Sequence, residues 1–431
     1  MTHRSTPGAD LTIGPLRAAP GTRASGHIQL DAGGTTLAIP VVLVNGAKPG
    51  PRVAVTAGIH GAEYVSIAAL RQVANGLDPA EVAGCLVAVL VANPAAFAAR
   101  SIYVNPLDGR NLNRVFPGDP AGTASERIAA WIVSEVMTGS DAYVDMHCGD
   151  MNEALVSFTG IEETGDAAID DVARSMAAAY GLDFLVVGAL PGSTTTTATS
   201  LGIPAVLGEV GGQGLWQAAD VALHADGFRR VLASLGLRAG AGDPAGRATR
   251  RLGQDVWLRS TATGFWHPAV GPGAAVHAGQ PVGAVRDAFG GVLQDVTAPL
   301  DGTVLFVVSS LAMNEGDPLL AIGGGVGASR PQGETAADGR GRARRRRVQS
   351  GASGRFGVGL LVVFVALGDR LAGGDPGRAG VIGLPERGRL GREGGGRRLR
   401  LVVLLAPTAQ HLDVGGHDLR LPVTDAAIVI P

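Results

Sequence analysis

Cysteine and lysine are both scarce in this chain of 431 residues. Two cysteines, Cys85 and Cys148, cannot build a disulfide framework, and their scarcity is typical of a reducing compartment. Lys48 is the only lysine, so nearly all the positive charge is arginine. We interpret the arginine bias as the codon preference of a GC-rich genome rather than as a sign of function.

Long apolar runs and a strong net charge are also lacking. The most apolar candidate, residues 358–367, is shorter than the ~18 residues of a membrane-spanning helix. Residues 1–20 contain no apolar stretch of the kind found in secretory signals. A formal net charge of -2 gives no bulk attraction to nucleic acid or anionic membranes. We therefore expect a soluble, cytoplasmic protein that binds neither, and the sequence leaves its oligomeric state open.

Residues 25–245 alternate short apolar runs with segments of helical periodicity. The first two runs are separated by residues 31–34, whose glycines predict a hairpin turn. Further along, a strand at 53–57 precedes a helix at 65–77, and this order repeats down the region. Strands separated by helices predict an α/β fold with a mixed, largely parallel sheet flanked by helices.

Three other regions differ from this one. Residues 1–24 are polar and interrupted by Pro and Gly, which predicts a loosely ordered N-terminus. Residues 250–325 hold short strand-like runs split by Gly and Pro, which predict a small all-β, barrel-like domain. Residues 328–431 form an Arg/Gly-rich tail with 17 arginines against 9 acidic residues. Its composition favours a disordered extension or a frameshift product over a nucleic-acid-binding segment.

Four ionisable residues lie at the downstream ends of expected strands: His60, Glu63, His147 and Glu209. A His-x-x-Glu pair alone is common by chance, and its ordinary interpretation is a helix cap beside a surface carboxylate. In open parallel sheets, however, sites form beyond the carboxyl ends of the strands, so the four residues can converge. Two His and one Glu form the ligand set of a catalytic zinc site with a position left for water.

Glu209 is the candidate general base of such a site. Zinc lowers the pKa of its water, and a second carboxylate can then take the proton. The alternative for Glu209 is a strand-end carboxylate that caps a helix or pairs with an arginine. Residues 100–118, dense in Asn and Arg, indicate a substrate-binding loop because arginine binds carboxylates bidentately. The alternative for this segment is a solvated surface loop.

Four motifs occur in the order in which one enzyme family carries them. They are His60-Gly61-Ala62-Glu63, Asn111-Leu112-Asn113-Arg114-Val115-Phe116-Pro117-Gly118, Asp145-Met146-His147 and Glu209-Val210-Gly211-Gly212. Together they resemble the succinylglutamate desuccinylase/aspartoacylase family of zinc hydrolases, relatives of the zinc carboxypeptidases. The resemblance covers residues 25–325, because the later β segment also resembles that family's C-terminal β-barrel.

The resemblance implies one Zn²⁺ per chain, held by His60, Glu63 and His147. It also implies that Glu209 is the catalytic carboxylate and that Arg100 polarises the scissile carbonyl. The expected fold is zinc-carboxypeptidase-like, followed by the small β domain.

Substrate contacts are implied for Asn113 and Arg114, which would hold a substrate carboxylate. Residues 148–150, Cys-Gly-Asp, depart from the family pattern, where a small hydroxyl residue and glycines are expected. We interpret Cys148 as a small packed side chain. For a substrate-contacting tyrosine the sequence offers three candidates, Tyr64, Tyr103 and Tyr180.

The predicted function is therefore a zinc-dependent deacylase that hydrolyses the amide bond of an N-acyl amino acid or a related small molecule. One alternative is a zinc carboxypeptidase acting on small peptides, and another is a non-catalytic protein that binds metal or carboxylate. A biotinyl or lipoyl carrier is a third, suggested by residues 298–302 and 312–314. A carrier domain of this kind bears its cofactor on a lysine. The only lysine, Lys48, lies in another region, and Asn314 stands at the position where that lysine would be expected.

Overall fold

The computed structural model describes residues 9–238, 249–325, 411–414 and 417–420. The chain divides into two compact units, residues 1–341 and 342–431. Of the second unit the structure describes one antiparallel hairpin, β20 (His411–Val414) with β21 (His417–Arg420). The rest of the tail predicted at 328–431 lies outside the described residues.

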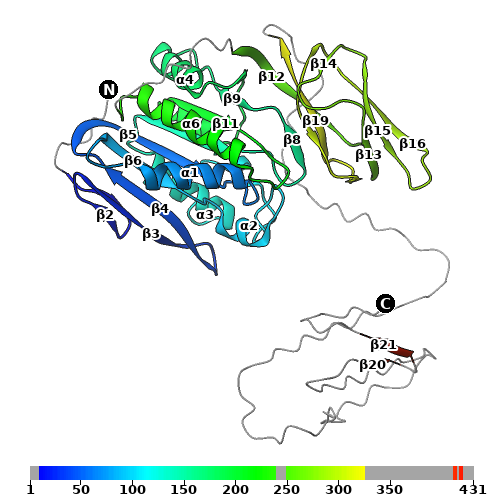
Figure 1. Cartoon of the computed structure of the whole chain (residues 1–431), viewed down its shortest axis with the longest axis horizontal. Helices are drawn as coiled ribbons and strands as arrows, with labels where there is room; N and C mark the ends of the chain where they lie inside the picture. The colour runs from blue at the N-terminus through cyan, green and yellow to red at the C-terminus, as the bar shows by residue number, and fades with distance from the viewer. Residues whose placement is uncertain (1–8, 239–248, 326–410, 415–416, 421–431) are drawn as a thin grey trace, which may run out of the picture. The chain divides into compact units, whose positions relative to one another are not determined.

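A long mixed sheet runs through the first unit (Figure 1). The α/β part contributes β3 (Thr22–Asp31), β4 (Thr36–Asn45), β5 (Lys48–Ala57), β6 (Ala83–Val89), β7 (Ala142–His147), β9 (Phe158–Ile161), β10 (Phe184–Val187) and β11 (Ala205–Glu209). Strands β6, β5, β7 and β11 are neighbours in that order, and each pairs in parallel with the next. Their carboxyl ends therefore meet at one edge, as the sequence predicts.

Helices cover both faces of this part. One face carries α1 (Tyr64–Gly76), α4 (Ala167–Tyr180) and α6 (Ala218–Ser234), and the other carries α2 (Pro94–Ala99), η1 (Leu112–Arg114), α3 (Ala124–Trp131), η2 (Ile132–Met137) and α5 (Thr194–Ser200). Alternate residues of a strand face opposite sides of a sheet. Accordingly Val53 and Val55 lie in the core under α1, and Ala54 lies in the opposite core.

The N-terminal segment differs from its prediction. Residues expected to be loosely ordered form a hairpin of β1 (Leu11–Ile13) and β2 (Leu16–Ala18). Leu11 and Ile13 are buried, and the Asn45 side chain donates hydrogen bonds to the carbonyls of Ala9 and Ala18. Strands of three residues are too short to leave a readable pattern, so this order comes from tertiary contacts.

The predicted all-β character of residues 250–325 is confirmed, and we call this region the β module. β12 (Arg250–Arg259), β14 (Ala275–Val276), β17 (Gly302–Val308) and β19 (Pro318–Gly325) extend the central sheet, while β13 (Gly264–Pro268), β15 (Pro281–Arg286), β16 (Val292–Thr297) and β18 (Ala312–Met313) form a separate antiparallel sheet. The junction is the parallel pairing of β10 with β12. The sequence pattern shows no sign of this junction, because pairing between distant strands leaves no local signal.

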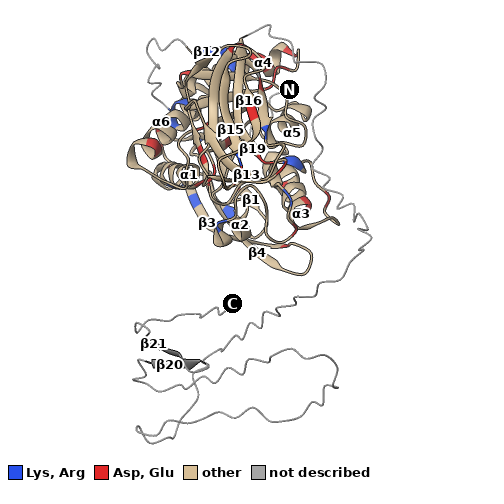
Figure 2. Ribbon diagram, turned by 90° about the vertical axis from the view of Figure 1, so that its right-hand side faces the viewer, with Lys and Arg blue, Asp and Glu red and all other residues tan. Residues whose placement is uncertain are grey.

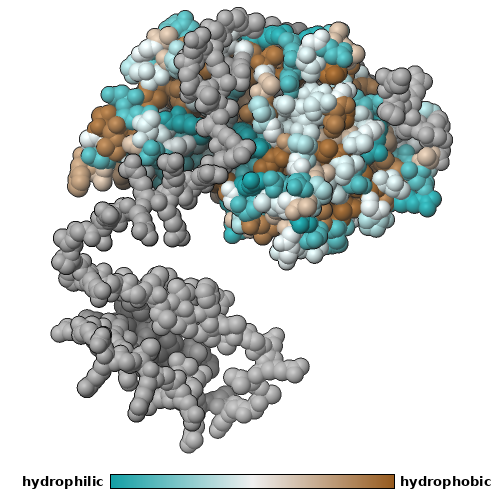
Figure 3. Space-filling view, turned by 180° about the vertical axis from the view of Figure 1, so that it is seen from behind, coloured by the Kyte–Doolittle hydropathy of each residue, from teal (hydrophilic) through white to brown (hydrophobic). Residues whose placement is uncertain are grey.

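Charged residues are spread along the described part of the chain. In the ribbon of Figure 2, positions of Lys and Arg are interspersed with positions of Asp and Glu. On the opposite side from Figure 1, apolar and hydrophilic residues alternate in small areas (Figure 3). No helix in the described part of the chain is both long enough and apolar enough to cross a membrane.

Candidate active site

The first two ligand candidates lie in the turn that joins β5 to α1. His60 is in the turn, and Glu63 directly precedes the first residue of the helix. Gly61 allows this turn to pack against α2, since a Cβ at Gly61 would lie 2.1 Å from the backbone nitrogen of Phe97. The turn therefore directs both side chains to the edge where the parallel strands end.

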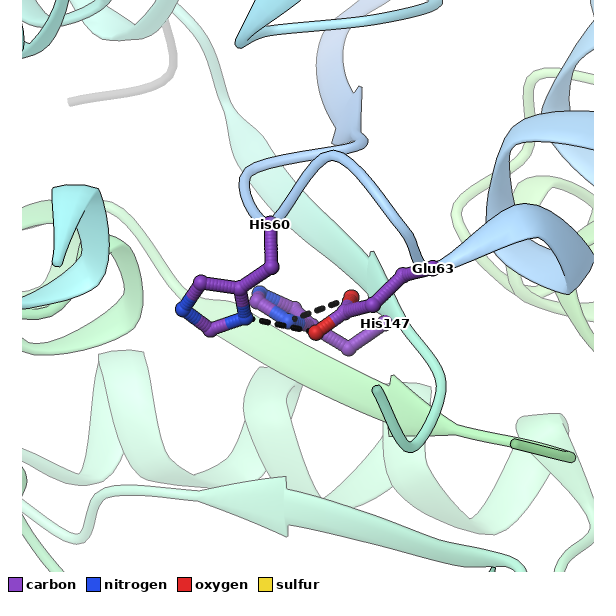
Figure 4. Close-up of side chains that lie close together, drawn as sticks. All are labelled: His60, Glu63 and His147. Atoms are coloured by element: carbon purple, nitrogen blue, oxygen red, sulfur yellow. Dashed lines mark hydrogen bonds and ion pairs between the residues drawn. The ribbon is translucent and has the colours of Figure 1, made fainter. Parts of the chain in front are cut away.

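His147 reaches the same edge because β7 lies beside β5 in parallel register. Glu63 lies between the two imidazoles, with Oε1 2.5 Å from His60 Nδ1 and Oε2 3.0 Å from His147 Nδ1. Figure 4 shows the three side chains pointing toward one another. Their ligand atoms all lie within 4.8 Å of one another.

The partners of the two imidazoles show that this set fits a metal ion. His60 Nε2 is 3.0 Å from the amide oxygen of Asn111, and His147 Nε2 is 2.8 Å from a carboxylate oxygen of Asp145. Those oxygens accept hydrogen bonds, so each ring carries a proton on Nε2, and Nδ1, the nitrogen that faces Glu63, is the atom that could bind a cation. Two imidazole nitrogens and a carboxylate aimed at one point form a ligand set that a divalent cation could bind.

Asp145 is held in turn by a buried hydrogen-bond network. It lies two residues before His147, on the same face of β7, and is fully buried. Thr56 Oγ1 donates to its Oδ1 at 2.7 Å, and the Tyr143 hydroxyl lies within hydrogen-bond distance of the Thr56 hydroxyl. Thr194, the first residue of α5, donates to the other oxygen of Asp145. The orienting role of Asp145 was not predicted from the motif that contains it.

Glu209 ends β11 directly opposite His147 in the strand register. Its Oε2 is buried and has no hydrogen-bond partner in the part of the chain that the structure describes. Burial raises the pKa of this carboxyl well above its ordinary value; the His147 imidazole opposes the rise, and the Glu63 carboxylate adds to it. A divalent cation beside Glu209 would favour the ionised form. This unpaired oxygen is the position from which a base could accept a proton.

The loop predicted to recognise substrate lies next to these residues, but its members differ in exposure. Asn113 is buried, and its Oδ1 accepts a hydrogen bond from the backbone nitrogen of Thr194 at 2.9 Å. Arg114 is exposed, and its Nη1 donates to the Asn113 carbonyl at 2.7 Å. Arg100 lies at the end of α2 with an exposed side chain that makes no hydrogen bond or ion pair with the described residues. The structure therefore does not bring Arg100 to the ligand cluster by a direct contact.

A second acidic pair, Asp150 and Glu153, holds this loop and was not predicted to be functional. Asp150 accepts a hydrogen bond from the backbone of Tyr103 at 2.8 Å, and the Tyr103 hydroxyl donates to Glu153 at 3.0 Å. Burial raises the pKa of Glu153 to about 7, although the backbone of Asp150 and the Tyr103 hydroxyl oppose that shift. Of the predicted tyrosines, Tyr103 therefore contacts this acidic pair. The side chain of Cys148 is buried in the core, as expected.

The fold and the ligand cluster together define a metallohydrolase-like α/β protein, and comparison with known proteins gives the family. Residues 49–235 match the succinylglutamate desuccinylase/aspartoacylase catalytic domain. Residues 49–235 therefore form a catalytic domain of this family of deacylases, with the His60/Glu63/His147 set as its metal site.

Individual relatives agree with this assignment. N-alpha-acetyl-L-2,4-diaminobutyric acid deacetylase of Halomonas elongata is 29% identical over 293 residues, which cover 66% of this chain and 85% of the relative. A succinylglutamate desuccinylase/aspartoacylase structure from Rhodobacter sphaeroides superposes with a TM-score of 0.64 at 27% identity, covering 70% of this chain and 95% of that one. The product-bound ectoine utilization protein EutE (DoeB) of Ruegeria pomeroyi has the same fold, with a TM-score of 0.65 at 24% identity and coverages of 74% and 99%.

Proposed function

We propose that this deacylase uses zinc to hydrolyse the amide bond of a small N-acyl amino acid. The observation that carries the proposal is the convergence of His60, Glu63 and His147 beside the unpaired Oε2 of Glu209. The relative from Halomonas elongata acts on an N-acetylated diamino acid, which makes acetyl amides of amino acids the first substrates to test.

The donor set favours zinc among divalent ions. Two imidazole nitrogens and one carboxylate are the ligands of many catalytic zinc sites, whereas magnesium and calcium prefer oxygen ligands alone. When bound, zinc supplies Lewis-acid polarisation of the amide carbonyl and makes water more acidic. One ion per chain is expected, because one such cluster is found among the described residues.

The protein's own groups would move the proton and hold the substrate. Glu209 Oε2 would take a proton from the attacking water and deliver it to the leaving amine. Asn113 and Arg114 would bind the substrate carboxylate, Arg114 through its guanidinium and Asn113 through its amide nitrogen, since its amide oxygen is already engaged by Thr194. Arg100 would polarise the carbonyl only if its side chain turned inward from its exposed position.

The same proposal includes the domain limits, the cellular location and the kind of partner. Residues 25–245 would be the hydrolase domain, and residues 250–325 a β domain that supports the site. Cys85 and Cys148 are free and buried, which fits a cytoplasmic location. The partner would be a small molecule rather than nucleic acid or membrane.

Metal analysis combined with a substrate panel tests the proposal. Full-length protein purified without chelator should hold about one zinc ion per chain and release acetate from N-acetyl amino acids. Absence of stoichiometric zinc would refute the metal assignment. Cleavage of C-terminal residues from small peptides, without hydrolysis of any N-acyl amino acid, would favour the carboxypeptidase alternative.

A further inference from the structure

A second buried histidine, His224 on α6, lies behind the metal-binding cluster. The Tyr180 hydroxyl, at the end of α4, donates to its Nδ1 at 2.6 Å. Its Nε2 is 2.9 Å from the backbone carbonyl oxygen of His147. A carbonyl can only accept, so Nε2 carries the proton and Nδ1 accepts from the tyrosine. The imidazole thus connects two helices to the main chain of a ligand residue.

This hydrogen bond is shorter than another that the His147 carbonyl accepts. The other comes from the Val210 backbone nitrogen at 3.3 Å, just beyond the end of β11. His147 is the last residue of β7, where the strand ladder ends. The His224 donor therefore secures the main chain of His147 at a point where the sheet alone holds it by a longer bond.

The space around Tyr180 also indicates that this arrangement is specific. A Cβ at Gly227 would lie 2.4 Å from the Tyr180 ring, and a Cβ at Gly208 would lie 2.6 Å from it. Gly227 is on α6 and Gly208 is on β11, directly before Glu209. Two glycines on different elements therefore make room for one ring, which packs under the strand that carries the candidate base.

The surroundings of the pair are otherwise apolar. Tyr180 belongs to a core cluster with Phe228 and Ala177, and both Tyr180 and His224 are fully buried. Burial lowers the pKa of His224 to about 3, so the ring stays neutral at any pH near 7. A buried polar pair that is fully hydrogen-bonded fixes one arrangement of a core, whereas a partly satisfied pair is costly.

We propose that Tyr180 and His224 are positioning residues that hold the main chain of His147, and hence its metal-binding side chain, in register with Glu209. The inference rests on the proposed zinc function. It assigns no contact with substrate to either residue.

Zinc affinity, measured by chelator competition on the full chain, separates positioning from packing. His224→Leu keeps an apolar volume but removes the donor to His147, and Tyr180→Phe removes only the hydroxyl. His224→Gln can restore a donor near the position of Nε2. Phe228→Leu is the matched control, because it perturbs the same helix and the same core without touching His147.

We expect His224→Leu to bind zinc about tenfold more weakly than the wild type, as loss of outer-sphere support commonly does. Tyr180→Phe should show a smaller loss, and His224→Gln should recover most of the affinity. The Co²⁺-substituted absorption spectrum should change in His224→Leu and stay unchanged in Phe228→Leu, although the control lowers the melting temperature.

Equal zinc affinity in wild type, His224→Leu and Tyr180→Phe would overturn the positioning role. If His224→Leu does not fold, Tyr180→Phe decides alone, because it keeps the ring and its packing. Failure of the proposed function looks different, since the wild-type protein itself would then bind no zinc.

Discussion

The α/β part and the β module bury different kinds of side chain. Among the described residues, the buried acidic and histidine side chains all belong to the α/β part: Glu63, Asp145, His147, Asp150, Glu153, Asp170 and His224. In the β module the buried polar residues are Ser260 and Thr303, and its core is otherwise apolar. Burying ionisable groups is costly unless they are paired or bind a metal. The difference therefore places the chemistry in the α/β part and leaves scaffolding to the β module.

The two regions are also in contact next to the turn that follows His147, the third ligand. β8 (Glu153–Leu155), which follows the turn after His147, pairs antiparallel with β17. The Ser309 nitrogen also donates to the Asn152 carbonyl at 2.7 Å. The β module thus holds the turn that carries Asp150 and Glu153. Changes in the β module should reach the site through this turn and through Arg114, whose guanidinium interacts electrostatically with Asp255 and Arg259 of β12.

Glu209→Gln should have the largest effect on turnover. It removes the proton-accepting oxygen while keeping the shape of the side chain, so kcat should fall by about 10²–10⁴-fold with zinc retained. Steady-state hydrolysis measures kcat, and metal analysis measures the zinc content. The same change at the exposed Glu315 of the β module should leave both values unaltered. Near-wild-type turnover in Glu209→Gln would remove the base from the mechanism.

Asp145→Asn should mainly weaken metal binding. The carboxylate accepts from His147 Nε2 and two hydroxyls, and an amide cannot accept all three with equal strength. Zinc affinity should fall by about 10–100-fold. Asp170→Asn is the control, since Asp170 is also buried but accepts its hydrogen bonds from Thr164 and Gly165. Equal zinc affinity in the two variants would show that Asp145 does not orient the ligand.

Glu153 lies where β8 pairs with β17 of the β module, and it should make the free energy of unfolding depend on pH. Its pKa rises from 4.5 to about 7 on folding, so the native state binds more protons than the unfolded state between these values. The contribution of Glu153 to stability is then highest below pH 4.5 and falls by about 3 kcal/mol as pH rises to 7, beyond which it is constant. Denaturant unfolding of metal-free protein at several pH values measures the slope. Glu153→Gln should flatten it, and an unchanged slope would contradict this origin.

The sequence predicted much of the α/β part because its segments are long and periodic. The helix expected at residues 65–77 is α1 to within one residue at each end, and the strand expected at 53–57 is the second half of β5. The convergence of His60, Glu63 and His147 followed from a general property of parallel sheets. Strand ends supply the ligands, so their positions could be inferred without coordinates.

The supporting residues could not be predicted in the same way. Asn111 lies 51 residues from the histidine that it orients, and no local pattern connects them. In the sequence, His224 is an ordinary residue of an amphipathic helix. Only the fold shows that Tyr180 of α4 lies within hydrogen-bond distance of it. Asp145 did have a signal, since residues i and i+2 of a strand share a face. Tertiary contacts decide the orientation of each ligand, and a single sequence does not contain them in readable form.

The smallest effect is expected at the turn between β15 and β16. Phe289 is 98% exposed there, and Asp287 organises the turn by accepting hydrogen bonds from the backbone nitrogens of Phe289 and Gly291. Phe289→Ser should change stability by less than about 0.5 kcal/mol and leave kcat and zinc affinity unaltered. Thermal unfolding and hydrolysis measure this. A clear loss of activity would mean that the turn between β15 and β16 contributes to the reaction. The assignment of the chemistry to the α/β part and of a supporting role to the β module would then no longer hold.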